Sequence, residues 1–328
     1  PRHGRLTTHR RVGIVPRVVD TADAAPEAAP DEARPDAILA VDIGASKFAT
    51  GLMTMRGALI DRSRVETERD VGPQSHFAAL AAIVQEQLDR AERHHRVRVR
   101  SIGVASAGPI ERGCETVSPI GLESWRRFPL RQHLADLTGL PVYGDLDARA
   151  LALGEGWLGA AKGLSSFAAM TVSTGIGGGF VIDGKLLDGA SGNAGQVGHI
   201  IVEPGGRRCQ CGARGCLEAE ASGYAIEAIT GRPTSEPTYD IMVRTGKLVG
   251  RAAGMICNSL DLDLVVVGGA VALGFAATFY NAAQEEIDEV AKIGTGARAR
   301  ITPARLGDQG SLIGAGAVGL RGLHRESR

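Results

Sequence analysis

The chain has 328 residues, which is too long for one ordinary hydrophobic core and about right for two domains. Hydrophobic residues make up 44% of it, which excludes a wholly disordered or fibrous protein. Basic and acidic residues both number 37 and aromatics reach only 4%, so a generally basic nucleic-acid binder that stacks bases is excluded as well.

Glycine is in excess, with 45 residues, so we expect tight turns and sites lined by backbone. No apolar run reaches the ~18 residues that a membrane helix needs, and the N-terminus has no apolar core of the signal-peptide type. Three of the five cysteines lie close together between 209 and 216, which suits a metal site in a reducing compartment. We therefore expect a cytoplasmic protein with no membrane segment.

Residues 1–36 carry many arginines, alanines, prolines and acids but little that a core could bury, so we expect a disordered tail. Short apolar segments then predict buried strands at 38–41 and 102–106. Two further strands are predicted between them, in the apolar stretch that ends at 52 and at 58–65, where apolar residues give way to alternation. Apolar residues recur at helical spacing from Phe77 to Leu88, which predicts an amphipathic helix before the last of these strands.

The second half repeats this order. It predicts a strand at 167–172, a glycine turn at 175–179, a returning strand at 180–182, a helix at about 240–260 and a buried strand at 264–267. Such a repeat indicates a weak internal duplication that gives two α/β lobes with a cleft between them. We expect one lobe at 37–143, joined by a C-terminal helix at about 311–323, and the other at 144–310.

A candidate phosphate loop, Asp42-Ile-Gly-Ala-Ser-Lys47, comes directly after the first buried strand. Gly44 lets backbone N–H groups approach an anion, Ser46 can donate to a phosphate, and Lys47 supplies positive charge. Asp42 could hold a water on Mg²⁺. A simple hairpin turn is the alternative, because Asp and Gly are common turn residues.

Two further glycine segments follow buried strands. Ser173–Gly179 lies between two strands, so it is not the dinucleotide motif, in which a helix follows the glycines. Gly268-Gly269 follows the strand at 264–267 and offers a surface without side chains that could accept a flat ring. Three such segments in one chain favour a nucleotide bound between the lobes.

Asp147 stands where a predicted strand gives way to a helix through Leu151–Glu155. One interpretation is a helix N-cap, for which aspartate is well suited. The other is a general base that takes a proton from an attacking hydroxyl. The local sequence leaves both open.

One imidazole and three thiolates predict a tetrahedral zinc site. The candidate ligands are His199, Cys209, Cys211 and Cys216. Gly212 and Gly215 permit the turns that would bring the last two cysteines onto one ion. Four protein ligands leave no open position, so we expect a structural rather than a catalytic metal. Buried free cysteines are the alternative.

Together these motifs resemble the ROK family of repressors and sugar kinases over about residues 38–322. The most specific resemblance is Gly195-Gln-Val-Gly-His199 with Cys209-x-Cys-Gly-x-x-Gly-Cys-Leu-Glu218. Asp42–Lys47 is similar to the first phosphate loop of the family, D-I-G-G-T-K, and Ser173–Gly179 resembles the second. Asp147–Glu155 resembles the family string D-A-N-A-A-A-L-G-E, whose aspartate is the catalytic base.

The resemblance implies a two-lobed actin-like (RNase H-like) ATPase fold and transfer of the ATP γ-phosphoryl group, with Mg²⁺, to a sugar hydroxyl, commonly the 6-hydroxyl. It makes Asp147 the catalytic base. It implies ATP or phosphate contacts at Asp42, Gly44, Ser46, Lys47, Thr174, Gly175, Gly177, Gly268 and Gly269. It implies sugar contacts at Gly108, Leu146, Asp147, Gln196, His199 and Glu218, with zinc shaping their loop. It also implies a homodimer or homotetramer.

The departures from the family pattern bear on the sugar. The family usually has Asn where Leu146 stands, often has Glu where Gln196 stands, and in many glucokinases has Asn where Ile120 follows Pro119. Sites that bind a hydroxyl through such groups discriminate strongly against its loss. We therefore expect an amino, deoxy or otherwise modified hexose, since family members act on N-acetylmannosamine and kanosamine.

Three functions remain open at this point. A sugar kinase is favoured, because residues 1–36 are about half the length of the winged helix-turn-helix that the family's repressors carry. A sugar-responsive DNA-binding repressor is the main alternative. A catalytically inactive sugar sensor is the third, although Asp42, Asp147 and both phosphate loops are present.

Overall fold

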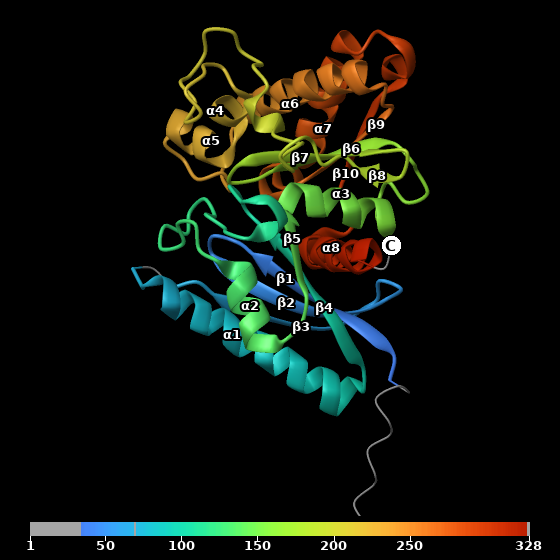
Figure 1. The fold of residues 1–328 in the computed structure, drawn as a ribbon. Coiled ribbons are helices and arrows are strands. Elements are labelled where there is room, and N and C mark those ends of the chain that lie inside the picture. The colour runs from blue at the N-terminus through green and yellow to red at the C-terminus, as the bar shows by residue number, and fades with distance from the viewer. Residues whose placement is uncertain (1–33, 69, 327–328) are drawn as a thin grey trace, which may run out of the picture. The chain divides into compact units, whose positions relative to one another are not determined.

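The computed structural model describes residues 34–68 and 70–326, which contain two mixed five-stranded sheets with helices on both faces (Figure 1). Most of the predicted tail, residues 1–33, lies outside the described residues. The predicted end at 36 is wrong, because Asp36 is the first residue of the strand Asp36–Ile43. No helix in the part that the structure describes is long and apolar enough to cross a membrane.

The first sheet has the order β3-β2-β1-β4-β5. Its strands are β1 (Asp36–Ile43), β2 (Lys47–Thr54), β3 (Leu59–Glu66), β4 (Arg98–Ser106) and β5 (Val142–Leu146). Strands β1, β2 and β3 form an antiparallel meander, whereas β4 and β5 are added in parallel to β1.

The second sheet repeats this arrangement in the order β8-β7-β6-β9-β10. Its strands are β6 (Phe167–Val172), β7 (Ile176–Ile182), β8 (Lys185–Leu186), β9 (Leu264–Gly268) and β10 (Arg300–Pro303). Again an antiparallel meander is extended by two parallel strands. The internal duplication predicted from the sequence is therefore confirmed.

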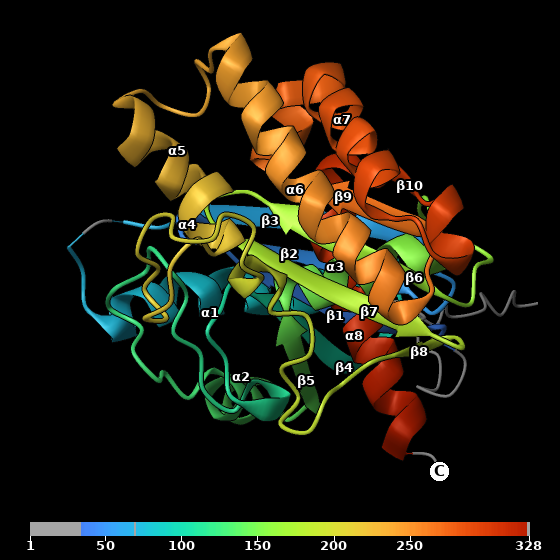
Figure 2. The ribbon, with the colours of Figure 1, turned by 90° about the horizontal axis from the view of Figure 1, so that it is seen from above.

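Helices cover both faces of each sheet. They are α1 (Pro73–Arg90), α2 (Leu130–Thr138), α3 (Asp147–Trp157), α4 (Leu217–Ala221), α5 (Gly223–Thr230), α6 (Tyr239–Leu260), α7 (Ala270–Val290) and α8 (Gly310–Glu326). Figure 2 shows α6 and α7 side by side along the second sheet, and α6 coincides with the helix predicted at about 240–260.

Local sequence explains where several helices begin and end. Pro73 opens α1, at a position where the missing N–H has no intrahelical partner anyway. The hydroxyls of Ser222 and Thr238 cap α5 and α6 by accepting hydrogen bonds from backbone N–H groups. Gly139 and Gly231 end α2 and α5 in the left-handed conformation that glycine adopts without strain.

Alternate residues of the central strands face two different cores. In β1, Leu39 belongs to the core beneath α1 and α2, whereas Ala40 belongs to the core beneath α8. In β9, Val265 faces α6 and α7, whereas Val266 faces α3. Because both faces are buried, these strands are continuous apolar runs rather than alternating ones, which is why the sequence predicted them.

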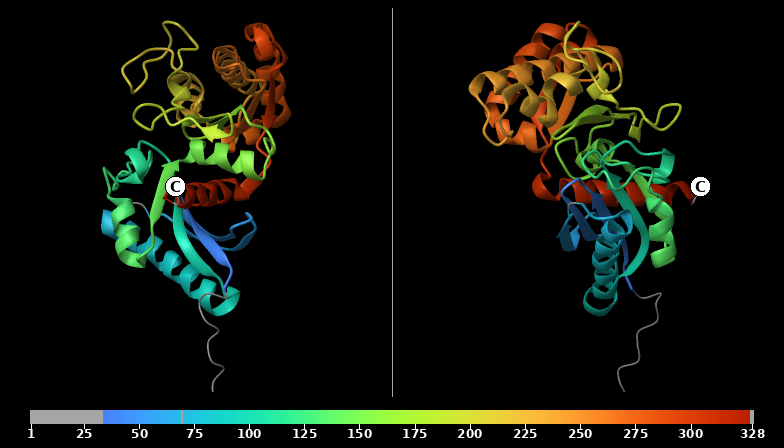
Figure 3. Two further views of the ribbon diagram at one scale, coloured as in Figure 1. Left: turned by 45° about the vertical axis from the view of Figure 1, so that its right-hand side comes forward. Right: turned by 90° about the vertical axis from the view of Figure 1, so that its left-hand side faces the viewer.

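Helix α8 packs on the first sheet, α3 packs on the second, and the two helices pack on each other (Figure 3). Glycine allows this close contact. A Cβ on Gly314 of α8 would lie 2.6 Å from the Ala150 carbonyl oxygen of α3. A Cβ on Gly103 of β4 would lie 2.0 Å from the Ala315 carbonyl oxygen. Much of the glycine excess thus serves helix packing.

The prediction of a glycine turn at 175–179 is wrong in its extent. The turn is confined to Ser173–Gly175, where the Ser173 N–H donates to the Gly175 carbonyl at 2.9 Å, and β7 begins at Ile176. Gly178 and Gly179 lie within the strand. Side chains there would collide with Val197 and with α3, so these glycines are required by packing rather than by a turn.

Candidate active site

Three parallel strands of the first sheet end in register. The last residues of β1, β4 and β5, namely Ile43, Ser106 and Leu146, are paired across the sheet. The segments that follow them therefore start from one edge, and they include the predicted phosphate loop and Asp147. This edge is where ligands of open α/β sheets collect.

Asp147 is the first residue of α3, and the N-cap is Leu146, so the interpretation of Asp147 as the N-cap is wrong. Its Oδ1 accepts a hydrogen bond from the Ala148 N–H at 2.7 Å. The pKa of Asp147 is raised to about 6, mainly because burial penalises the ionised carboxylate and, in a smaller part, because Asp42 lies nearby.

Glu218, near the start of α4, belongs to the same group of carboxyls. Its Oε2 accepts a hydrogen bond from the Ile176 N–H at 2.6 Å. Burial, with a smaller contribution from Asp147, raises the pKa of Glu218 to about 7. A Cβ on Gly175 or Gly198 would lie 3.1 or 3.0 Å from the Glu218 carboxylate, so both turns are in contact with it.

Asp42 is the third member of this group. Burial raises its pKa, whereas a hydrogen bond with Ser311 and the charge of Lys47 act in the opposite direction. Ser311 lies in the first turn of α8. The sequence analysis placed this helix with the first lobe but did not predict the contact of Ser311 with Asp42. Three acidic side chains thus converge with Lys47 as the neighbouring cation.

The other predicted phosphate and nucleotide residues lie in the β1–β2 turn of the first sheet and after β6 and at the end of β9 in the second, except Gly177, which lies within β7. The β1–β2 turn is closed by the Gly44 N–H, which donates to the Lys47 carbonyl at 3.1 Å. Ser46 and Thr174 are exposed. Gly269, at the end of β9, is in the left-handed conformation, and a Cβ there would lie 2.4 Å from the Val172 carbonyl oxygen. This glycine is therefore required by the close approach of β6.

The predicted sugar contacts divide into a buried and an exposed part. Leu146 is 9% exposed and lies against Gly108, where a Cβ would come within 2.8 Å of the leucine Cδ2. Gln196 and His199 are exposed; Gln196 precedes a short helical turn at 197–199, and His199 is its last residue. The backbone carbonyl of Gly195 accepts a hydrogen bond from the Gly178 N–H at 2.8 Å, which fixes this segment to β7.

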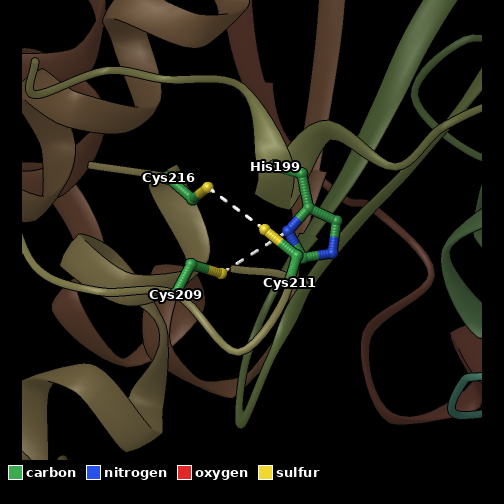
Figure 4. A group of neighbouring side chains, drawn as sticks. All are labelled: His199, Cys209, Cys211 and Cys216. Atoms are coloured by element: carbon green, nitrogen blue, oxygen red, sulfur yellow. Dashed lines mark hydrogen bonds between the residues drawn. The ribbon is translucent and has the colours of Figure 1, made fainter. Parts of the chain in front are cut away.

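The four predicted zinc ligands converge on one point (Figure 4). Their ligand atoms all lie within 4.8 Å of one another. The Cys209 Sγ–His199 Nδ1 distance is 3.6 Å and the Cys211 Sγ–Cys216 Sγ distance is 3.7 Å. A tetrahedral zinc with ordinary bond lengths requires separations of about 3.6 Å and about 3.8 Å for these pairs, so the residues fit the metal.

The backbone around these ligands explains the glycines of the motif. Gly212 and Gly215 have positive φ, as predicted, and a Cβ on Gly215 would lie 1.7 Å from the Glu203 carbonyl oxygen. The Cys209 N–H donates to the Ala213 carbonyl at 2.8 Å, which closes the loop between the first and last cysteines. A side chain at Gly215 would open this turn.

Arg149 is a further residue that the sequence interpretation missed. It lies two residues after Asp147, at the position where the family string D-A-N has Asn, and this difference was the available signal. The guanidinium is buried and bonds to Asp145, Asp188 and two backbone carbonyls.

Comparison with known proteins identifies the family. The model of the ROK family matches residues 38–321, and the chain belongs to this family. A glucokinase of Halalkalibacterium halodurans is 30% identical over 312 residues, with 84% of this chain and 92% of that protein covered. An N-acetylmannosamine kinase of Haemophilus influenzae is 30% identical over 293 residues, with 84% and 93% covered.

Solved structures show the same fold. A ROK hexokinase from Thermus thermophilus matches with a TM-score of 0.74 and 32% identity, over 88% of this chain and 99% of that one. A ROK family transcriptional regulator, described as a homologue of the E. coli MLC protein, matches with a TM-score of 0.75 and 23% identity, over 88% and 79%. The second similarity shows the fold alone. The predicted family and fold class are confirmed.

Proposed function

We propose that this protein is a carbohydrate kinase that transfers the γ-phosphoryl group of ATP to a hydroxyl of a hexose or modified hexose. The observation that carries the proposal is the group of three neighbouring carboxyls, Asp42, Asp147 and Glu218, together with a cluster of four side chains that could hold a metal ion. In phosphoryl transfer one carboxylate accepts the hydroxyl proton and another faces the metal on the phosphates. The relatives named glucokinase and N-acetylmannosamine kinase support this reaction.

Asp147 is assigned as the general base. With a pKa of about 6 it is ionised at neutral pH yet more basic than an ordinary aspartate, which favours proton transfer. The Ala148 N–H fixes Oδ1, so the other carboxylate oxygen is oriented to accept the hydroxyl proton. The hydroxyl oxygen then bonds to the γ-phosphorus while the bond to the β–γ bridging oxygen breaks, and ADP leaves.

The turns at the strand ends are assigned to the phosphates of ATP. Backbone N–H groups of the β1–β2 turn and of Ser173–Gly175 would hold the phosphate oxygens, and Lys47 adds positive charge. Mg²⁺, when bound with ATP, supplies positive charge against the triphosphate. Asp42 fits the position facing it, because a partly buried carboxyl with raised pKa and another carboxyl nearby gains most from a cation. By family resemblance, Gly268 and Gly269 contact the adenosine.

The sugar is assigned to the space beside Leu146, Gln196, His199 and Glu218. His199 presents Nδ1 to the cysteines, so Nε2 on the other side of the ring is available to a sugar hydroxyl (Figure 4). Zinc, when bound, fixes the loop between His199 and Cys216 and has no open position for chemistry. Its role is thus to orient the sugar-binding imidazole.

The particular sugar follows from two side chains. Leu146 presents an apolar surface where the family usually has Asn, and a hydroxyl buried against it without a partner costs about 1–3 kcal/mol. Gln196 is neutral where the family often has Glu, and it both donates and accepts. We therefore propose phosphorylation at the 6-hydroxyl of a hexose modified at C2, C3 or C4, with glucose as a poor substrate.

The test is release of ADP from ATP and Mg²⁺ across a panel of hexoses, N-acetylated hexosamines and amino sugars. At least one sugar should stimulate ADP release, and NMR of the product should show phosphate on the 6-oxygen. Asp147→Asn should abolish the stimulation, whereas Asp136→Asn, which alters an exposed aspartate on α2, should retain it. Sugar binding without ADP release would instead indicate a sugar-responsive regulator or a non-catalytic sensor.

Two further properties belong to this proposal. We propose a cytoplasmic location, which is supported by the free thiols of the metal site and by the need for ATP. We also propose a homodimer or homotetramer, on the family resemblance. Light scattering coupled to size-exclusion chromatography would give the mass, and a monomer under assay conditions would contradict the second statement.

A further inference from the structure

The guanidinium of Arg149 joins α3 to two other parts of the chain. The side chain is 1% exposed. Its Nε donates to Asp145 on β5 at 2.5 Å, and one terminal nitrogen donates to Asp188 at 2.8 Å. The other terminal nitrogen donates to the carbonyls of Leu187 at 2.6 Å and Ala194 at 3.0 Å.

The two carbonyls mark the ends of one loop. The Ala194 N–H donates to the Asp188 carbonyl at 3.1 Å, so the loop 187–194 is closed at its base, where Arg149 binds it. Gly195 and Gln196 follow directly, and His199 ends the next turn. Arg149 therefore connects the helix that begins with Asp147 to the root of the segment that carries the proposed sugar contacts.

On the loop, the carboxylate that binds Arg149 belongs to Asp188, and two more arginines contact it. Asp188 also accepts hydrogen bonds from Arg321 at 2.8 Å and Arg325 at 2.7 Å, both on α8. These hydrogen bonds and charges, together with that of Arg149, hold the pKa of the Asp188 carboxyl far below its usual range, despite partial burial. The loop is thus bound to α3 and to α8 by ion pairs that share the Asp188 carboxylate.

Stability alone is a poor reason for such a network. Buried ion pairs lose solvation that their attraction often only repays, and apolar residues of similar volume can serve as well. A planar guanidinium, in contrast, can bond to a carboxylate and to two carbonyls in fixed directions at once, which lysine cannot do. The Arg149 contacts therefore fix the position of the loop 187–194 relative to α3.

We propose that Arg149 is a positioning residue that sets the distance between the general base Asp147 and the sugar-binding segment 195–199. The proposal rests on the proposed kinase function, for which Asp147 takes the proton and Gln196 and His199 hold the sugar. A displacement of about 1 Å between reacting groups can cost roughly 100-fold in rate. Loss of the Arg149 contacts should therefore lower catalysis while leaving ATP binding intact.

The experiment compares Arg149→Lys with Arg98→Lys. Arg98 is a half-buried arginine on β4 that pairs with Asp36 at the opposite ends of the strands. In Arg149→Lys, kcat/KM for the sugar should fall by roughly 10- to 100-fold, with KM for ATP changed by less than about twofold and the zinc content unchanged. Arg98→Lys should keep wild-type kinetics. Equal kinetics of Arg149→Lys and wild type would overturn the proposal.

Hydrogen–deuterium exchange gives a second measurement that needs no activity. Amides of 187–199 should exchange faster in Arg149→Lys, whereas those of α6 and α7 should exchange at the wild-type rate. Unchanged exchange at 187–199 would overturn the proposal even if the enzyme is active. If Arg149→Lys fails to fold, the kinetics and the hydrogen exchange are measured on Asp188→Asn instead, with the same changes expected. If no sugar stimulates ADP release in wild type, the kinase function fails, and the exchange result still tests the positioning.

Discussion

At the scale of single residues, Asp147 is the proposed general base, and its replacement gives the most direct prediction. Asp147→Asn keeps the size of the side chain and an oxygen that can accept from the Ala148 N–H, so the variant should fold and bind ATP. It cannot take a proton, and turnover should fall by roughly 10²- to 10⁴-fold. Steady-state kinetics with the preferred sugar measures this. Near-normal turnover would show that Asp147 only starts the helix.

The raised pKa of Asp147 predicts opposite effects of pH on rate and on stability. Turnover should rise as Asp147 loses its proton around pH 6. The free energy of unfolding should decrease over the same pH range, because the folded state binds this proton more tightly than the unfolded chain, in which the pKa is near 3.8. The stabilisation that comes from proton binding at Asp147 is thus fully present below pH 3.8 and is lost as pH rises through 6.

Asp147→Asn removes this titration. The variant should therefore gain about 1–2 kcal/mol in unfolding free energy relative to wild type at pH 7.5, and less at pH 4.5. Urea unfolding at both pH values measures the difference, with Asp136→Asn as the control. A gain that does not depend on pH would contradict the assigned pKa.

Leu146 and Gln196 predict the choice of sugar. Leu146→Asn together with Gln196→Glu should restore hydrogen-bonding groups that the family usually carries, and so shift kcat/KM towards glucose. Burying a hydroxyl against Leu146 without a partner costs about 1–3 kcal/mol, so the ratio of kcat/KM should shift by roughly 5- to 100-fold. The measurement is the ratio of kcat/KM for glucose to that for the best modified hexose. A wild-type preference for glucose would contradict our interpretation of both positions.

The site residues that could be predicted from the sequence are those that belong to a short sequence motif. The zinc ligands come from two nearby segments, so local spacing indicated them. Asp147 was assigned through the family resemblance, because the local sequence left the N-cap alternative open. Ser311 and Arg149 could not be assigned in this way. Their contacts depend on how α8 returns to β1 and on how loop 187–194 meets α3, and neither is encoded in spacing along the chain.

At the scale of elements, the metal loop 199–216 gives a separate prediction. Cys211→Ser should lose the zinc, of which the wild type should contain about one per chain, and should lower the thermal midpoint. Gln210→Ser is the matched control, because Gln210 is exposed and lies between two ligands without being one. Metal analysis and thermal unfolding give the readouts. Full stability and activity without zinc would refute a structural role.

The strands and long helices could be predicted because their apolar patterns match their burial. β1 and β9 are buried on both faces and α6 on one, and the sequence shows continuous runs for the strands and a stripe for the helix. β7 was misjudged because its glycines indicated a turn. Their cause is tertiary, since α3 and Val197 pack against the strand and leave no room for side chains.

At the scale of the whole molecule, the contact between α3 and α8 joins the two sheets. Gly314→Ala should destabilise the protein by about 1–3 kcal/mol, because the new methyl group would meet the backbone of α3. It should also lower turnover, since α3 carries Asp147 and α8 carries Ser311. Gly274→Ala on α7 is the control. A Cβ there meets nothing within 4 Å, so this variant should be neutral or slightly stabilised.

The path of the chain through the two sheets also governs how the protein is made. Helix α8 is synthesised after every strand of both sheets, yet it covers β1 and β4, which are synthesised well before it. On the ribosome, one apolar face of the first sheet therefore stays uncovered while the whole second sheet is produced, a condition that favours aggregation or chaperone binding. A nascent chain that stops before residue 310 already contains Asp42, Asp147 and the metal ligands. It still lacks Ser311 and the α8 contacts that pack on α3, so we expect activity to require translation through α8.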